Sequence, residues 1–211
     1  MKIPSKYSNL IFIMASILVI CTILIVNIIA NNNKQTNETL NLLSGKHYVQ
    51  ITVKDMGDIK LELDADIAPI TVTNFINLVK EGFYDGLTFH RIIDGFMVQG
   101  GDPEGTGMGG STKTIKGEFT ANGVENSISH VRGVISMARS SNSYNSASSQ
   151  FFIVHKDSAF LDGEYAAFGK VISGIEVIDK LAQTKTEDEN GTVLKQNQPI
   201  IDSIKIIEAG E

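Results

Sequence analysis

The pattern of apolar and polar positions divides the chain into two unequal parts. Residues 10–30 are almost wholly apolar and include no charged residue. A run of about twenty such residues is long enough to cross the hydrocarbon core of a bilayer as a helix. Lys2 and Lys6 precede the run, so the positive-inside rule predicts a short cytoplasmic N-terminus, residues 1–9, and a remainder outside the cytoplasm.

Two other interpretations of residues 10–30 stay open. A cleaved signal peptide would have a shorter apolar region that ends in small residues; Ala30 fits this pattern, whereas Ile28 does not. Lipidation at Cys21 after cleavage is disfavoured, because bulky Ile20 stands where a small residue is expected. We therefore expect a transmembrane helix that anchors the chain in the cell membrane, with secretion as the outcome if the segment is cleaved.

The chain beyond this segment begins with a polar, Asn-rich stretch, residues 31–45, which predicts a linker. Short runs of strand character follow. They lie at residues 48–53, 59–63, 87–93, 96–99, 131–137, 151–154, 167–172 and 201–207. Apolar residues at helical spacing predict one helix that begins at Pro69 and ends at Gly82, and a second over residues 175–181.

Eight strands and two helices predict a mainly β domain over residues 46–211. We expect a closed eight-stranded antiparallel β-barrel capped by the two α-helices and preceded by the N-terminal transmembrane helix. Closure is favoured because it removes the exposed edges that an open sheet would present. We expect this domain to be monomeric.

Composition excludes several classes of function. The net charge of −6 argues against a nucleic-acid binder, which would carry a basic face. The single cysteine, Cys21, allows no intrachain disulfide. The four histidines are far apart in the sequence, so we expect no metal site and no cofactor.

Residues 89–102 read FHRIIDGFMVQGGD and place Arg91 within an apolar strand. On this stretch alone, a core strand with one surface arginine would be the simplest interpretation. In a regular strand Phe96 and Val98 would face one side and Met97 and Gln99 the other, unless the backbone bends after Gly95.

Four segments together, in this order and spacing, resemble the cyclophilin-type peptidyl-prolyl cis/trans isomerases. They are residues 89–102, residues 105–119 (GTGMGGSTKTIKGEF), residues 133–153 (GVISMARSSNSYNSASSQFFI) and residues 160–169 (FLDGEYAAFG). The resemblance covers roughly residues 46–208. It implies a cyclophilin-like fold and an enzyme that accelerates rotation of X–Pro bonds in extracytoplasmic protein folding. The glycine-rich segment lacks a P-loop lysine, so it predicts a surface loop and no nucleotide site.

The resemblance also assigns roles to residues. Arg91 would be the catalytic hydrogen-bond donor to the prolyl nitrogen, with Phe96 and Gln99 beside it. A donor at that nitrogen strengthens only as the amide twists, so it stabilises the transition state selectively. The residues implied to bind the substrate are Met97, Ala138, Arg139, Gln150, Phe152, Phe160, Leu161 and Tyr165. The partners implied are proline-containing polypeptides, together with the membrane through residues 10–30.

Four positions depart from the family pattern. Phe160 stands where a tryptophan is usual, which puts cyclosporin binding in doubt. Tyr165 stands where histidine is often found, and Arg139 where asparagine is common. Asp94 replaces a common proline and places a negative charge three residues from Arg91.

A second function from another class is a peptide-binding or holdase chaperone module in which turnover is incidental. Arg91 favours the enzyme, because a module that only binds peptides has no need of a donor to the prolyl nitrogen.

Overall fold

The computed structural model describes residues 20–27 and 42–210. Residues 20–27 are helical, and most of the predicted anchor and linker lies outside the described residues. Among the described residues, no helix combines the length and apolar character that crossing a membrane requires. A separate compact unit begins at Leu43, whose N–H donates a hydrogen bond to Thr73 Oγ1 at 2.8 Å.

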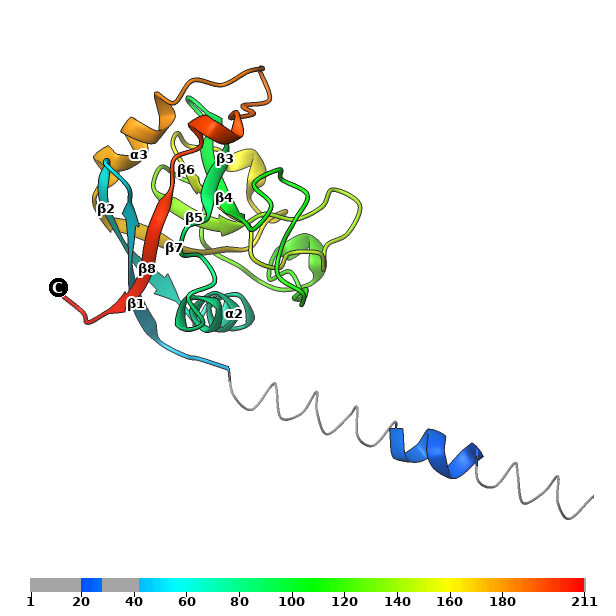
Figure 1. Cartoon of the computed structure of the whole chain (residues 1–211). Helices are drawn as coiled ribbons and strands as arrows, with labels where there is room; N and C mark the ends of the chain where they lie inside the picture. The colour runs from blue at the N-terminus through cyan, green and yellow to red at the C-terminus, as the bar shows by residue number, and fades with distance from the viewer. Residues whose placement is uncertain (1–19, 28–41, 211) are drawn as a thin grey trace, which may run out of the picture. The chain divides into compact units, whose positions relative to one another are not determined.

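This unit is built on one eight-stranded antiparallel sheet (Figure 1). The strands are β1 (Lys46–Val53), β2 (Gly57–Asp64), β3 (Thr88–Ile93), β4 (Met97–Asp102), β5 (Val134–Met137), β6 (Phe151–Val154), β7 (Ala167–Ser173) and β8 (Ile201–Ile207). Their order across the sheet is β3-β4-β6-β5-β7-β2-β1-β8. All eight predicted strands are confirmed; the largest shift at a strand start is in β5, which begins at Val134 rather than at residue 131.

The prediction of a fully closed barrel holds only in part, because the sheet forms a half-barrel. The outermost strands, β3 and β8, share no regular ladder, and the seam is a single bridge between Thr88 and Ile200. Two backbone bonds flank it, from Phe89 N to Pro199 O at 2.9 Å and from Ile201 N to Leu87 O at 2.8 Å. Pro199 has no N–H to donate, which is one reason that the ladder does not continue through this segment.

The two predicted helices are confirmed as α2 (Pro69–Lys80) and α3 (Ile175–Ala182), which lie at opposite ends of the strand layer (Figure 1). Pro69 occupies the first turn of α2, where a missing N–H costs nothing. The buried carboxylate of Glu118 accepts the N–H groups of Ile70 at 3.0 Å and Thr71 at 2.8 Å. A side chain about fifty residues away in the sequence therefore caps this helix.

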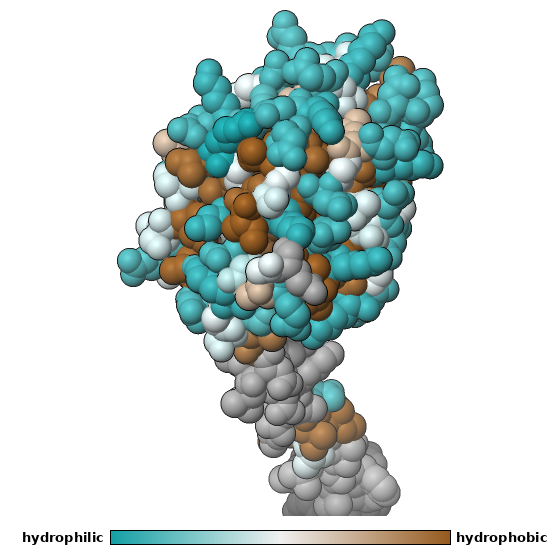
Figure 2. All heavy atoms as spheres, turned by 90° about the vertical axis from the view of Figure 1, so that its left-hand side faces the viewer, coloured by the Kyte–Doolittle hydropathy of each residue, from teal (hydrophilic) through white to brown (hydrophobic). Residues whose placement is uncertain are grey.

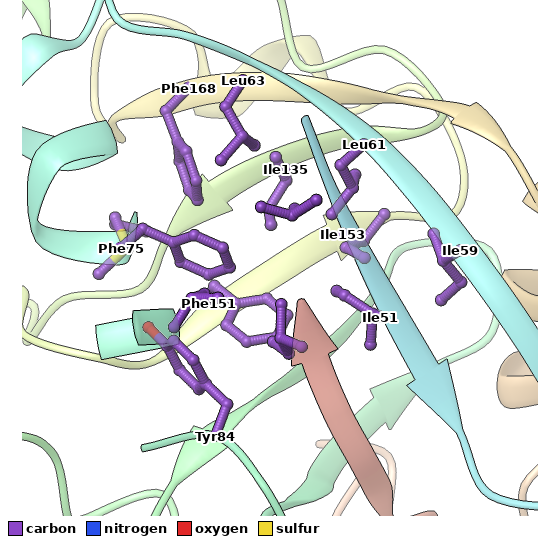
Figure 3. Close-up of a cluster of buried hydrophobic side chains, with 14 of the residues drawn as sticks. Ile51, Ile59, Leu61, Leu63, Phe75, Tyr84, Ile135, Phe151, Ile153 and Phe168 are labelled. Atoms are coloured by element: carbon purple, nitrogen blue, oxygen red, sulfur yellow. The ribbon is translucent and has the colours of Figure 1, made fainter. Parts of the chain in front are cut away.

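Apolar side chains form two separate clusters on the two faces of the sheet. The larger, which we call the inner cluster, fills the barrel and includes Phe75, Tyr84 and Phe151, whose ring centroids lie 5.1–5.6 Å apart (Figure 3). The smaller, which we call the outer cluster, consists of Met97, Val134, Phe152, Val154, Leu161 and Ala167. On the face drawn in Figure 2, apolar residues lie in small groups between hydrophilic ones, as is normal for a folded domain.

Candidate active site

The outer cluster opens into a cavity of about 260 Å³. The side chains around it come from β3, the turn between β3 and β4, β4, β6 and the loops after β5 and β6. They are Arg91, Phe96, Met97, Gln99, Ala138, Arg139, Phe152, Phe160, Leu161 and Tyr165. Each of these residues was predicted from the sequence to belong to the site, and the structure brings them together around one cleft. Gln150, also predicted, lies outside the lining and contacts the cleft through Gln99.

The turn between β3 and β4 decides which side chains face the cleft. Gly95 adopts a φ of +73°, which favours glycine, and the backbone bends there. Phe96 therefore packs with Met97 on the outer cluster, while Val98 points into the inner cluster. The alternation of a regular strand, which would group Phe96 with Val98, therefore does not apply here, and the alternative of a bend after Gly95 is confirmed.

Arg91 is held at the edge of the cavity by hydrogen bonds on both sides of its guanidinium. Its Nε donates to the backbone oxygen of Asn190 at 2.9 Å, and its Nη2 donates to Asn190 Oδ1 at 3.2 Å. On the other side, Nη1 donates to Gln99 Oε1 at 3.2 Å. These contacts fix the plane of the guanidinium beside the apolar lining.

Partial burial lowers the pKa of the Arg91 guanidinium from its ordinary value, and Tyr165 and Asp188 oppose that shift. An arginine stays protonated under any condition in which the protein is folded, so Arg91 acts as a fixed donor and not as an acid or base.

Gln99 is oriented from behind by Gln150. Its Nε2 donates to Gln150 Oε1 at 2.9 Å, which leaves the Gln99 carbonyl turned to Arg91. Gln150 in turn donates to the backbone oxygens of Gly107 at 3.0 Å and Gly109 at 2.7 Å. The glycine-rich loop therefore supports the polar side of the cleft through two glutamines.

The apolar side of the cleft consists of Met97, Phe152 and Leu161, all of which are buried. Phe160 forms the rim: its side chain is 71% exposed, and its ring centroid lies 5.4 Å from that of Phe96. An apolar floor with a half-open aromatic rim is the kind of surface that a proline ring can occupy without losing hydrogen bonds.

His130 lies beneath this floor and was not identified from the sequence as part of the site. Its ring stacks on Phe152 at 6.0 Å and an interplanar angle of 17°. Its Nδ1 is 2.8 Å from Asp162 Oδ1, and its Nε2 is 3.0 Å from Ser136 Oγ. Burial lowers the pKa of His130 below its ordinary value, which favours the neutral ring, although Asp162 opposes the shift.

Asp94, the negative charge expected near Arg91, instead lies against His155, with 3.3 Å between Oδ1 and Nδ1. A hollow of about 490 Å³ lies beside this turn and is lined by Asp94, Gly95, Arg132, His155, Lys156 and Asp157. Two of its cationic or basic side chains share one carboxylate: Arg132 Nη2 and His155 Nε2 lie 2.7 and 3.0 Å from Asp179 Oδ1. The backbone N–H of His155 donates to Phe96 O at 2.8 Å, so this cluster also holds the turn that carries Phe96.

Asn190 is the other residue of the site that sequence reasoning missed. It precedes Gly191, whose φ is +80° and whose position leaves only 2.2 Å between an added Cβ and Ile92 O. The Asn-Gly pair indicates a tight turn in the sequence. Nothing in the pattern indicates that the turn packs against β3 and presents its asparagine to Arg91.

Comparison with known proteins gives a consistent result. Residues 48–211 match the family model described as cyclophilin type peptidyl-prolyl cis-trans isomerase/CLD. Peptidyl-prolyl cis-trans isomerase A of Dickeya dadantii is 45% identical over 161 residues, which cover 72% of this chain and 80% of the relative. Peptidyl-prolyl cis-trans isomerase B of Bacillus subtilis is 44% identical over 144 residues, which cover 68% and 92%.

A solved structure shows the same fold. The crystal structure of a cyclophilin type peptidyl-prolyl cis-trans isomerase of Cryptosporidium parvum superposes with a TM-score of 0.69 at 32% identity, over 78% of this chain and 99% of that chain. The agreement extends over nearly the whole compact unit, and the chain therefore belongs to the cyclophilin-type peptidyl-prolyl cis-trans isomerase family and is an enzyme of that activity.

Proposed function

We propose that the cleft isomerises X–Pro bonds by seating the proline ring on Met97, Phe152 and Leu161 while Arg91 donates to the prolyl nitrogen. The observation that carries this proposal is the fixed guanidinium at the edge of an apolar cavity, bound by Asn190 on one side and Gln99 on the other. The crystal structure of the related Cryptosporidium parvum enzyme in the presence of the dipeptide Ala-Pro supports a proline-containing substrate.

The chemistry requires no proton transfer. The planar amide has a rotation barrier of about 18–20 kcal/mol because its nitrogen lone pair is conjugated with the carbonyl. Rotation ends this conjugation and leaves the lone pair on nitrogen, where it accepts a hydrogen bond. A donor that is already oriented needs little reorganisation when this acceptor forms, so its effect falls on the transition state.

The Arg91→Ala variant tests this mechanism. We expect kcat/KM on an Ala-Pro peptide to fall by about two to three decades, which corresponds to about 3–4 kcal/mol of transition-state stabilisation. Peptide affinity should fall much less, because the apolar floor is intact. Arg91→Lys should restore only part of the activity, since an ammonium has no planar fork.

Lys205→Ala is the control, because Lys205 is an exposed cation of β8 that lies outside the cleft lining. It should keep the wild-type rate. Turnover near the wild-type rate in Arg91→Ala, confirmed as folded by circular dichroism, would overturn the catalytic role and favour the holdase alternative.

The location of the enzyme is a separate part of the proposal. We propose that residues 10–30 hold the isomerase domain at the outer side of the cytoplasmic membrane, where it acts on exported polypeptides. The support is the uncharged apolar run preceded by Lys2 and Lys6.

Protease added to spheroplasts tests this placement and should digest the isomerase domain. Protection of the domain until the cells are lysed would contradict an external location. An N-terminal sequence that begins near Asn31 would replace the anchor with a cleaved signal peptide.

A further inference from the structure

One part of the cleft lining is built around a buried arginine that takes no part in the mechanism above. The side chain of Arg139 is only 7% exposed. Three aromatic rings surround its guanidinium carbon, with centroids at 4.7 Å (Tyr165), 4.9 Å (Tyr144) and 5.4 Å (Phe119). We call these three rings the aromatic clamp. A cation so well removed from water interacts strongly with ring faces.

The edges of the guanidinium are also occupied. Nε donates to Glu164 O at 3.0 Å, Nη1 donates to Ser140 O at 3.0 Å, and Nη2 lies 3.3 Å from Glu164 Oε2. Stacked on its faces and bonded at its edges, the group has one geometry available. A lysine could supply the charge but neither the planar stack nor the fork of donors.

The aromatic clamp joins three segments that are far apart in the sequence. Phe119 follows Glu118, which caps α2, and is itself buried. Tyr144 lies in the loop between β5 and β6, and Tyr165 lies between the 3₁₀ turn Ala159–Leu161 and β7. Arg139 is the common contact that ties the two loops to the Phe119 segment.

Tyr165 transmits this arrangement to the substrate site. Its ring lines the cavity and meets Phe152 edge to face, with centroids 5.8 Å apart and planes at 83°. Any rotation of the Tyr165 ring therefore changes the shape of the floor on which the proline ring would lie. Arg139 and Tyr165 are also two of the positions at which this chain departs from the family pattern, and they are in contact with each other.

We propose that Arg139 is a positioning residue that fixes the Tyr165 ring against Phe152, so that the two residues act as a coupled pair that sets substrate affinity. The inference rests on the isomerase function proposed above. Arg91 is held independently by Asn190 and Gln99. Loss of the contact between Arg139 and Tyr165 should therefore raise KM and leave kcat, the turnover of bound substrate, nearly unchanged.

A double-mutant cycle tests the coupling. Arg139→Asn removes the guanidinium, and Tyr165→Leu removes the ring while it keeps an apolar side chain. Each single variant should raise KM for an Ala-Pro peptide about fivefold and change kcat less than about twofold. The double variant should also raise KM about fivefold rather than about 25-fold, because the contact is already lost in either single variant.

Three further variants separate positioning from general stability. Arg139→Lys keeps the charge and should still raise KM nearly as much as Arg139→Asn. Lys205→Asn, at an exposed cation of β8 outside the cleft lining, should leave kcat and KM unchanged. Tyr144→Leu removes a ring that contacts Arg139 but does not line the cavity, and it should raise KM by a smaller factor.

The outcomes distinguish this inference from the proposed function. If the two increases in KM multiply in the double variant, or if kcat falls while KM is unchanged, the proposal of a coupled pair is overturned. If Arg139→Asn does not fold, Arg139→Lys and Tyr144→Leu decide the question, since wild-type KM in both would exclude a positioning role. An inactive wild-type protein would instead overturn the proposed function.

Discussion

The inner and outer clusters come from adjacent residues of the same strands, yet only one of them is closed. In β6, Phe151 belongs to the inner cluster and Phe152 to the outer cluster. In β4 the same holds for Val98 and Met97. Successive side chains of a strand point to opposite faces, so one alternation supplies both the core and the binding surface.

The difference between the clusters lies in what covers them. The inner cluster is enclosed by the sheet and by α2 and α3, and its large rings are fully buried (Figure 3). The outer cluster has only loops and a short 3₁₀ turn over it, and Phe160 at its rim is 71% exposed. An incompletely covered apolar face provides a site, because a substrate can supply the missing packing.

Replacing one of two neighbouring phenylalanines should separate the roles of the clusters. Phe151→Ala should lower the free energy of unfolding by about 3–5 kcal/mol, because a large cavity forms in a closed core. Phe152→Ala should lower it by about half as much, since solvent and nearby loops can fill part of the space. Chemical denaturation measures both changes.

The two variants should rank in the opposite order in peptide binding. Phe152→Ala should raise KM at least tenfold, whereas any Phe151→Ala protein that stays folded should keep a KM within about threefold of wild type. Equal losses of stability together with equal KM values would contradict the division into a structural and a binding cluster.

Asn190 provides a second test, because it supports Arg91 on the polar side of the cleft. Asn190→Ala removes the hydrogen bond that Arg91 Nη2 donates to Oδ1 and leaves the one that Nε donates to the backbone oxygen. We expect kcat to fall about three- to tenfold, or about 0.7–1.4 kcal/mol, with KM nearly unchanged. Asn197→Ala, at an exposed asparagine of a neighbouring turn, is the control and should behave as wild type. An unchanged kcat in Asn190→Ala would show that the backbone bond and Gln99 hold Arg91 without the Asn190 side chain.

The pH dependence of stability should come from the outer cluster rather than the inner one, because His130 lies beneath the outer cluster. Burial lowers the pKa of His130 below 6.5, so the unfolded chain takes up a proton at a higher pH than the folded chain does. The contribution of His130 to the free energy of unfolding is therefore fully present above the pKa that this histidine has in the unfolded chain. It is lost as the pH falls from about 7 toward the lower pKa of the folded state, by at most about 1.4 kcal/mol per pH unit.

Denaturation curves between pH 7.5 and 5.5 should show this slope, and His130→Gln should reduce it. His90 is also buried, with burial lowering its pKa, and it contributes a slope of the same sign that the variant retains. The carboxylates with lowered pKa values, such as Asp162, titrate near pH 4 and below and lie outside this window. The same slope in the variant would exclude His130 as its source.

The elements of the fold were predictable because their signals are local. Alternation and turn residues locate the strands, and Pro69 and Gly82 bound a helix whose apolar spacing is regular. The seam between β3 and β8 was not predictable to the same degree, since it depends on how far the sheet curves and on the lack of an N–H at Pro199.

The residues of the site also differ in whether the sequence carries a local signal for them. Family motifs identified the cleft lining, but residues that act through distant contacts carry no local signal. Asn190 reaches Arg91 across 99 positions, and Glu118 reaches the start of α2 across 47 or 48. The contact between Arg139 and Tyr165 is likewise visible only in three dimensions, although the sequence marks both residues as unusual for the family.

Asp102 determines the shape of the glycine-rich loop and thereby affects how that loop can evolve. This buried carboxylate accepts the backbone N–H groups of Glu104, Thr106, Gly107 and Gly109 at 2.6–3.3 Å. Burial alone would raise its pKa, but these donors hold the pKa below its ordinary value.

Because every residue except proline supplies a backbone N–H, a loop held in this way does not depend on the identity of its outward-facing side chains. Met108, which is 88% exposed at the tip of the loop, is one such position. Substitutions there can alter the surface next to the cleft while Gln150 and Gln99 keep their support. The enzyme thus has a region in which new recognition properties can arise by mutation at little cost to its catalytic geometry.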